Sequence, residues 1–199
     1  MHFPIPLEVR TVAEELRKNG FEAYLVGGCV RDLFIGRTPK DWDVTTNAKP
    51  EDIQRIFPES FYENDFGTVG VKTGSEDSTL SIIEVTPYRT ESGYTDKRRP
   101  DEVTFGESLE DDLARRDFTI NAIALDESKG HIVDPYKGQK DIEAKVLKTV
   151  GVATDRFEED ALRLMRAIRL VAELGFALDT DTAAAIKEKG PNLGHVSRE

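Results

Sequence analysis

The segment from residue 23 to residue 46 constrains the fold more than any other part of the sequence. It contains a short apolar run, two adjacent glycines, an amphipathic stretch that ends at Gly36, and a second apolar run, in the letters AYLVGGCVRDLFIG and WDVTT. That order predicts a buried strand, a tight glycine turn, a short helix and a second strand. The unit therefore predicts an α/β or α+β fold class.

Two aspartates on the second strand give the first indication of chemistry. Asp41 and Asp43 are two residues apart, so both side chains project from the same face of an extended chain. Two like charges side by side are costly without a cation, and hard oxygen ligands suit Mg²⁺, which completes its shell with water and substrate phosphates. An isolated D-x-D pattern is more often a solvated strand end, so its surroundings have to decide.

Those surroundings contain groups that suit phosphate. Gly27 and Gly28 occupy the predicted strand-to-helix turn, where backbone N–H groups can approach phosphate oxygens, and Arg31 follows one turn later. Glu84 ends a later predicted strand, from which it could join the aspartate pair. We therefore predict Asp41, Asp43 and Glu84 as catalytic residues, with Asp41 and Asp43 as ligands of Mg²⁺. Two such ions would activate a hydroxyl and stabilise a leaving pyrophosphate.

Periodicity and turn residues organise the rest of the chain into two parts. We expect residues 1–150 to form a catalytic domain and residues 151–199 a small helical domain that is incomplete at its C-terminus. The polar stretch 87–107 predicts a long mobile loop. The expected helices are 7–19, 50–57, 108–114, 139–146, 155–174 and 179–189, and the further strands lie near 67–73, 79–86, 119–126 and 130–135.

The composition limits the cellular location and the binding partners that we expect for this protein. No apolar run approaches the roughly 20 residues that span a membrane, no secretory signal is present, and a single cysteine allows no disulfide framework, so we expect a cytoplasmic protein without a membrane role. A net charge of −11 has the wrong sign for RNA binding, although basic residues cluster locally, as in Lys97–Arg99. His131, His195 and Cys29 lack metal-ligand spacing, and we interpret them as structural.

Four motifs together resemble a known family. LVGGCVRD with DWDVTT, LARRDFTINAIALD, DPYKGQKDIEAK and FEEDALRLMRAIRL follow one another in the order typical of class II tRNA nucleotidyltransferases and bacterial poly(A) polymerases. The resemblance covers roughly residues 20 to 175. It implies a nucleotidyltransferase-type mixed sheet with flanking helices, followed by a small all-α domain. It also implies template-independent addition of CCA to tRNA 3′ ends from CTP and ATP.

The resemblance also implies roles for individual residues. Cytosine and adenine present an amino donor beside a ring-nitrogen acceptor, which matches a carboxylate beside a guanidinium, whereas guanine and uracil present the reverse. The alternatives are a surface ion cluster and an ordinary helix salt bridge between residues i and i+3. In the family pattern, the ribose and triphosphate are held by Arg115, Arg116, Asp117 and Asn121, and the base is read by Asp160 and Arg163, supported by Glu159, Arg166 and Arg169.

Several activities stay open at this point. Residues 88–107 match the family's mobile lever, and NDFGTVGVKTG favours CCA addition over poly(A) polymerase activity. Enzymes that add only CC or only the terminal A are further alternatives. The last residues, LGHVSRE, resemble the beginning of a further family segment. We therefore also consider a nucleotide-binding core that binds the tRNA 3′ end weakly and is inactive on tRNA, because the helical body and tail are missing.

Overall fold

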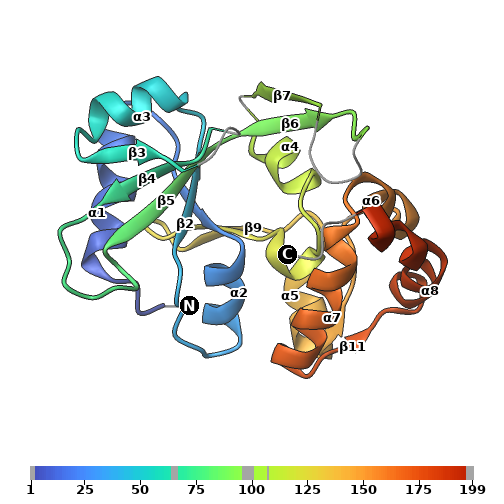
Figure 1. The fold of residues 1–199 in the computed structure, drawn as a ribbon. Helices are drawn as coiled ribbons and strands as arrows, with labels where there is room; N and C mark the ends of the chain where they lie inside the picture. Colours follow the sequence, from blue (N-terminus) through green and yellow to red (C-terminus); the bar gives the residue numbers. More distant parts are fainter. Residues whose placement is uncertain (1–2, 64–66, 96–100, 107, 196–199) are drawn as a thin grey trace.

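A seven-stranded mixed sheet forms the centre of the computed structural model, which describes residues 3–63, 67–95, 101–106 and 108–195 (Figure 1). The β2–β5 pair is parallel, and the other neighbouring pairs of this sheet are antiparallel. In sheet order, the strands are β3 (Ser60–Tyr62), β4 (Val69–Lys72), β5 (Ile82–Pro87), β2 (Asp43–Thr46), β1 (Tyr24–Val26), β8 (Ala124–Asp126) and β9 (His131–Val133).

Helices with one apolar face pack against this sheet. In α1 (Leu7–Lys18), the side chains of Val9, Val12 and Leu16 recur at helical spacing and are buried. No helix in the described part of the chain combines the length and the apolar character that crossing a membrane requires. The other helices of this part are α2 (Gly28–Phe34), α3 (Pro50–Ile56), α4 (Leu109–Ala114), α5 (Gly138–Ala144) and the 3₁₀ turn η1 (Thr119–Asn121).

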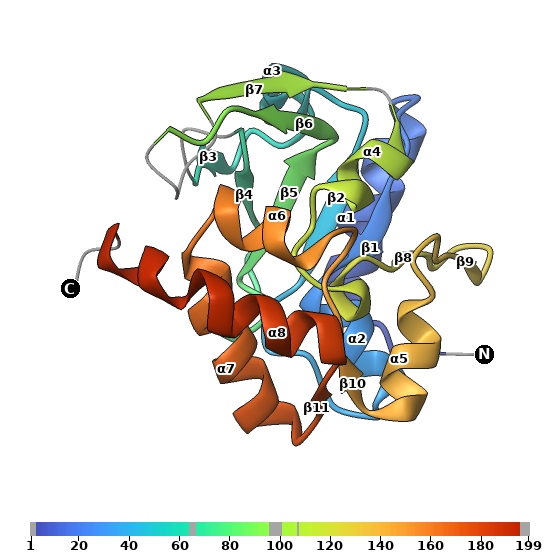
Figure 2. The ribbon, with the colours of Figure 1, turned by 90° about the vertical axis from the view of Figure 1, so that its right-hand side faces the viewer.

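The C-terminal part is mainly helical and packs on the same core (Figure 2). Phe157, Leu164 and Leu170 from this part belong to one buried apolar cluster with Leu25 and Val44 of the sheet. The mixed sheet with flanking helices confirms the predicted fold class. The C-terminal elements are α6 (Ala153–Glu159), α7 (Leu162–Leu174), α8 (Thr180–Lys189) and the 3₁₀ segment η2 (Gly190–His195), with β10 (Val146–Leu147) pairing in parallel with β11 (Ala177–Leu178).

Two predicted elements are wrong in their bounds. The expected helix 155–174 is two helices, because Asp160 is extended (φ −136°, ψ 107°) and its Oδ1 accepts a hydrogen bond from the N–H of Leu162 at 2.8 Å. An aspartate in such a position favours the start of a new helix over the continuation of the old one. The expected strand 119–126 begins as the turn η1 and becomes extended only at β8.

The expected loop 87–107 contains a β-hairpin, which is a third correction. Its strands, β6 (Arg89–Ser92) and β7 (Glu102–Phe105), pair in antiparallel register. Buried Tyr88 anchors the hairpin, because its N–H donates to the carbonyl of Thr46 at 2.6 Å and its hydroxyl to Glu22 at 2.9 Å. The basic run Lys97–Arg99 lies outside the described residues.

Candidate active site

The predicted carboxylates meet at the parallel pair of strands. Asp43 begins β2, and the register places Glu84 of β5 directly opposite it. Asp41 is exposed just before the strand, while Trp42 between the two aspartates is buried, as strand alternation predicts. Strand pairing therefore brings Glu84 opposite Asp43, as the sequence indicated. The predicted position of Asp41 on the same strand is wrong, because β2 begins at Asp43 and Asp41 lies in a bend before it.

The charges of this group are poorly balanced. Burial raises the pKa of Asp43, with Arg116 opposing the rise and Asp41 adding to it. Burial, together with the negative charges of Asp43, Glu63 and Asp41, raises the pKa of Glu84 to about 7. Among the described residues, no three acidic, histidine or cysteine side chains come close enough to hold a metal ion by themselves. An ion here would need further ligands from water or a substrate.

The glycine turn brings the backbone against these carboxylates. Gly27 has a φ of 79°, which strongly favours glycine. A Cβ at this position would lie 3.2 Å from Oδ2 of Asp43 and 3.3 Å from Nη1 of Arg116. Gly28 begins α2, where a Cβ would come no closer than 3.6 Å to Arg31. Of the two predicted glycines, Gly27 is thus the one that the site requires on steric grounds.

Arg116 is a partly buried cation beside the catalytic strand. Its Nη2 donates to Oδ2 of Asp112 at 2.9 Å, and its Nε is buried without a hydrogen-bond partner among the described residues. Arg115 donates to the other oxygen of the same carboxylate. Burial alone would raise the pKa of Asp112, but Arg116 and Arg115 outweigh it and hold this pKa below its ordinary value.

A second polar network surrounds Asp117. Its Oδ2 accepts from Nε and Nη2 of Arg166 at 2.8 and 2.7 Å, and its Oδ1 accepts from Asn121 at 3.2 Å and from the N–H of Phe118 at 2.8 Å. Asn121 in turn accepts from Arg31 at 3.0 Å. Burial opposes the charge of Asp117, but Arg166 reverses this effect and lowers the pKa of the carboxyl. A ribose hydroxyl would have to share oxygens that are already engaged.

The DPYKGQKD motif contacts the turn η1, which carries Asn121 of this network. Asp141 of α5 accepts a hydrogen bond from the hydroxyl of Thr119 at 2.6 Å, which fixes the turn η1 that carries Asn121. Gly138 lies so close to the carbonyl of Thr119 that any side chain there would collide with it. The sequence marked the motif only through its resemblance to a family, and the structure gives it a supporting role.

One cavity joins the carboxylates to the arginines. It has a volume of about 670 Å³ and opens between α2, the strands β2 and β5, and the helix α7. Arg37, Lys40 and Glu173 also line it and were not predicted, because exposed charged residues in a loop or on a helix give no signal by themselves. The predicted residues that line it are Gly28, Arg31, Asp41, Asp43, Glu84, Asn121, Arg166 and Arg169.

The predicted base-reading pair is arranged differently from the expectation. Asp160 lies in the break between α6 and α7, so it is not a neighbour of Arg163 on one helix face, and that prediction is wrong. Arg163 is buried and donates instead to Oε2 of Glu159 at 2.7 Å and to the carbonyls of Arg156 and Arg115 at 3.4 and 3.2 Å. Neither Asp160 nor Arg163 lines the large cavity.

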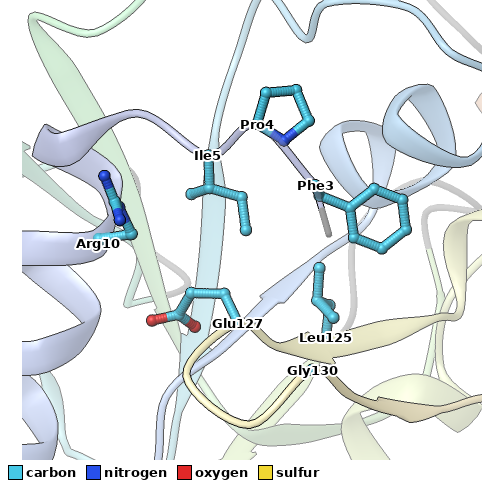
Figure 3. Close-up of a pocket in the computed structure, with 7 residues that line it drawn as sticks. All are labelled: Phe3, Pro4, Ile5, Arg10, Leu125, Glu127 and Gly130. Atoms are coloured by element: carbon cyan, nitrogen blue, oxygen red, sulfur yellow. The ribbon is translucent and has the colours of Figure 1, made fainter. Parts of the chain in front are cut away.

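Of the residues predicted to be structural, only Cys29 reaches the site: it lines the large cavity, and its thiol lies 3.8 Å from the backbone carbonyl of Asp43. Cys29 is buried, and its thiol donates to the carbonyl of Val26 at 3.2 Å, with burial raising its pKa to about 12. His131 is exposed on β9, and His195 ends η2. A separate cavity of about 260 Å³ lies under the N-terminal segment (Figure 3) and shares no lining residue with the large one, its walls being Phe3, Pro4, Ile5, Arg10, Leu125, Glu127 and Gly130.

Comparison with known families decides the membership of the chain. Residues 23–148 match the model of the poly(A) polymerase head domain. The chain belongs to the poly(A) polymerase head-domain family. The matched range contains the glycine turn, the three carboxylates and Asp112 to Asn121, whereas the segment from Glu159 to Arg163 lies beyond it.

Named proteins and solved structures resemble most of this chain. A CCA-adding enzyme of Geobacillus kaustophilus is 48% identical over 194 residues, which cover 94% of this chain and 45% of the relative. The crystal structure of the Bacillus stearothermophilus CCA-adding enzyme in complex with CTP is 44% identical and superimposes with a TM-score of 0.85 over 97% of this chain and 46% of that one. The chain thus spans about half the length of these relatives.

A more distant structure extends the likeness. A tRNA nucleotidyltransferase complexed with a primer tRNA and an incoming ATP analogue is 30% identical, with a TM-score of 0.70 over 92% of this chain and 50% of that one. Both solved structures therefore share the head-domain fold and the helices that follow it.

Proposed function

We propose that the chain is the nucleotide-selecting and catalytic part of a CCA-adding tRNA nucleotidyltransferase. In this activity, CMP and AMP are transferred from CTP and ATP to the 3′ end of tRNA, and pyrophosphate leaves. The observation that carries the proposal is the single cavity that joins Asp41, Asp43 and Glu84 to Arg31 and Arg166. The relatives named as CCA-adding enzymes support the choice of CTP and ATP over other nucleotides.

The carboxylate group fits a divalent cation. The raised pKa values of Asp43 and Glu84 indicate negative charge that the surrounding residues leave unbalanced, and carboxylate oxygens are ligands that Mg²⁺ prefers. We infer Asp41 and Asp43 as its ligands and two Mg²⁺ ions as the cofactor. When bound, the ions would polarise the phosphate oxygens and lower the pKa of the attacking hydroxyl. A Glu84 carboxyl that titrates near pH 7 is suited to accept the proton of that hydroxyl.

The opposite wall of the cavity suits a triphosphate. Arg31 is held by Asp32 at 2.8 Å and by Asn121 at 3.0 Å, so its guanidinium is fixed before any ligand binds. Arg116 brings a buried donor without a partner among the described residues to the same strand end. Fixed guanidinium groups recognise phosphate oxygens with little loss of side-chain entropy. We therefore keep Gly27, Arg31 and Arg116 as triphosphate-binding residues, and Asn121, which lines the cavity, as a contact of the ribose. Arg115 and Asp117 do not line the cavity, and we assign them a supporting role through their hydrogen bonds to Asp112 and from Asn121.

Base selection is assigned to the segment that follows the head domain. Nη1 of Arg163 donates to Glu159 and to the carbonyl of Arg156, and its Nη2 donates to the carbonyl of Arg115. Its Nε–H and one Nη2–H have no partner among the described residues. These donors suit the ring nitrogen of cytosine or adenine. Asp160, in the adjacent helix break, is the proposed acceptor for the amino group. This arrangement keeps the predicted roles of the pair while changing their geometry.

The remaining sequence-based expectations belong to the same proposal. They are a division near residue 150 into catalytic and base-reading domains, a cytoplasmic location, and a lever role for residues 88–107. Full CCA addition is favoured over poly(A) synthesis because two of the relatives above carry the former name.

The test is incorporation from each of the four labelled nucleoside triphosphates with Mg²⁺. The acceptors are tRNAs that end in the discriminator base, in C and in CC. The chain is compared with its Asp41→Ala variant and with Asp52→Ala, a matched substitution in α3 outside the cavity. We expect a limited addition of C and then A that Asp41→Ala abolishes and Asp52→Ala retains.

Other outcomes separate the competing functions. Long tracts of A would replace the proposal with poly(A) polymerase activity, and addition that stops at CC would make the chain a CC-adding enzyme. Binding of CTP and ATP without transfer would identify a nucleotide-binding core. Incorporation that survives Asp41→Ala would contradict the assignment of the catalytic carboxylates.

A further inference from the structure

Asp112 is a fully buried carboxylate that sequence patterns did not mark as functional. Its Oδ1 accepts from Nε and Nη2 of Arg115 at 2.9 and 2.6 Å, and its Oδ2 accepts from Nη2 of Arg116 at 2.9 Å. The hydroxyl of Thr45, two residues beyond Asp43 on β2, lies 3.3 Å from the same Oδ2. A buried charge is tolerated only when it is paired, so the carboxylate of Asp112 holds both guanidinium groups in place.

The two arginines connect this point to different parts of the site. Arg116 lies beside Gly27 and Asp43, next to the catalytic strand. Arg115 acts through its backbone, because its carbonyl accepts a hydrogen bond from Nη2 of Arg163 at 3.2 Å. The preceding carbonyl, of Ala114, accepts from Nη1 of Arg156 at 3.3 Å. The C-terminal end of α4 therefore contacts the base-reading segment directly.

We propose that Asp112 is a positioning residue for nucleotide selection. Its carboxylate fixes Arg116 beside the catalytic strand and fixes the end of α4, from which the Arg115 carbonyl orients the guanidinium of Arg163. The proposal rests on the proposed function, because it takes Arg116 as a triphosphate group and Arg163 as a base-reading group. Asp112 acts only through these residues and provides a link between the two halves of the nucleotide site.

The geometry of Arg163 explains why selectivity depends on this link. Three acceptors hold its guanidinium plane, namely Glu159 and the carbonyls of Arg156 and Arg115. The direction of its remaining N–H groups decides whether a ring-nitrogen acceptor or a ring N–H is matched. A shift of the Arg115 carbonyl turns this plane, so loss of Asp112 weakens the preference for one base over another as well as the affinity.

The test measures nucleotide binding rather than transfer to tRNA. CTP, UTP and CMP are titrated into the chain in the presence of Mg²⁺ by isothermal calorimetry, with Asp112→Asn as the variant. Asparagine keeps the size of the side chain but removes its charge and one acceptor oxygen. We expect the affinity for CTP to fall about tenfold. We also expect the ratios of the UTP and CMP dissociation constants to that of CTP to decrease.

Asp111→Asn is the matched control. Asp111 is the neighbouring residue of α4, carries the same side chain and is exposed, so its substitution should leave all three affinities unchanged. Melting followed by circular dichroism checks that each variant is folded. If Asp112→Asn does not fold, Asp112→Glu takes its place, since it keeps the charge but displaces both oxygens by one methylene, and the same decrease in the two ratios is expected.

The outcomes distinguish this role from the function on which it rests. Equal weakening of CTP, UTP and CMP, with both preferences kept, would overturn the positioning role, because a carboxylate that only stabilises the fold predicts that result. Unchanged binding by Asp112→Asn would overturn it as well. Failure of the unaltered chain to bind CTP or ATP would reject the proposed function itself.

Discussion

The two acidic groups of the site differ in how their charge is balanced. Asp43 and Glu84, at the parallel strand pair, have raised pKa values because burial and mutual repulsion exceed the help of Arg116. Asp112 and Asp117, on the side of the arginines, are more deeply buried and yet have lowered pKa values, because each is paired with guanidinium groups. The negative charge on the arginine side is therefore balanced by the protein itself, whereas the negative charge at the parallel strands is not.

This contrast separates preorganised recognition from ligand-dependent chemistry. A carboxylate that is saturated with arginine holds those arginines still and contributes to stability without a ligand. A carboxylate group with excess charge costs stability until a cation arrives. Substitutions on the carboxylate side are consequently expected to lower activity without lowering stability, whereas substitutions on the arginine side are expected to lower stability.

The largest effect is expected from Asp43→Asn. Removal of one proposed Mg²⁺ ligand should reduce nucleotidyl transfer by about 10³-fold, while the melting temperature stays the same or rises, because an unbalanced buried charge is lost. Transfer rates at saturating Mg²⁺ and melting curves in EDTA measure the two quantities. Asp52→Asn in α3 is the control with the same change of charge. A variant that keeps half of the activity, or that melts well below the unaltered chain, would contradict the proposed difference in charge balance between the carboxylate side and the arginine side.

The same contrast explains what could be predicted from the sequence. On the carboxylate side, the strand at Asp43 and the glycine turn follow from local patterns and were predicted correctly, whereas Asp41 lies just before the strand. The glycine turn indicated Arg31, the resemblance of the chain to a family indicated Asn121 and Arg166, and one cavity brings the three together. Gly27 is required by its positive φ, which a sequence pattern can indicate only as a turn.

The arginine side could not be derived in this way. An aspartate three and four residues before two arginines is typical of a surface ion pair, and the burial of Asp112 depends on packing against β2, which is remote in the sequence. The break at Asp160 was missed because helical periodicity continues through it, while the decisive interaction is a single side-chain cap. The hairpin was missed because its polar strands pair with each other and are anchored by Tyr88.

The next largest effect concerns stability on the arginine side. Asp117→Asn leaves Arg166 without its carboxylate and should lower the free energy of unfolding by about 3 kcal/mol, or the melting temperature by roughly 6–12 °C. Because the pKa of Asp117 is lowered in the folded protein, its contribution is present above the unfolded value of about 4 and is lost as the pH falls through the folded value. The difference between the two proteins should therefore be largest near neutral pH and shrink in acid. Melting curves from pH 3 to pH 7 measure it, and an equal difference at every pH would contradict the ion pair as its cause.

The smallest effect has the opposite sign and lies on the carboxylate side. The pKa of Glu84 is raised to about 7 in the folded protein, so its favourable contribution is complete below the unfolded value of about 4.5 and is lost as the pH rises through 7. Glu84→Gln should remove this loss and stabilise the protein at pH 8 in EDTA by about 1 kcal/mol, or roughly 2–4 °C. At pH 5 the two proteins should melt within a degree or so of each other.

Mg²⁺ provides the control for that last comparison. Added at pH 8, it should stabilise the unaltered chain more than Glu84→Gln, because only the former regains a balanced charge at the parallel strands. Stabilisation by Glu84→Gln that is the same at pH 5 and pH 8 would mean that packing, and not the charge of Glu84, sets the effect. In that case the two sides of the site would no longer differ in charge balance, and the raised reactivity proposed for Glu84 would have no electrostatic basis.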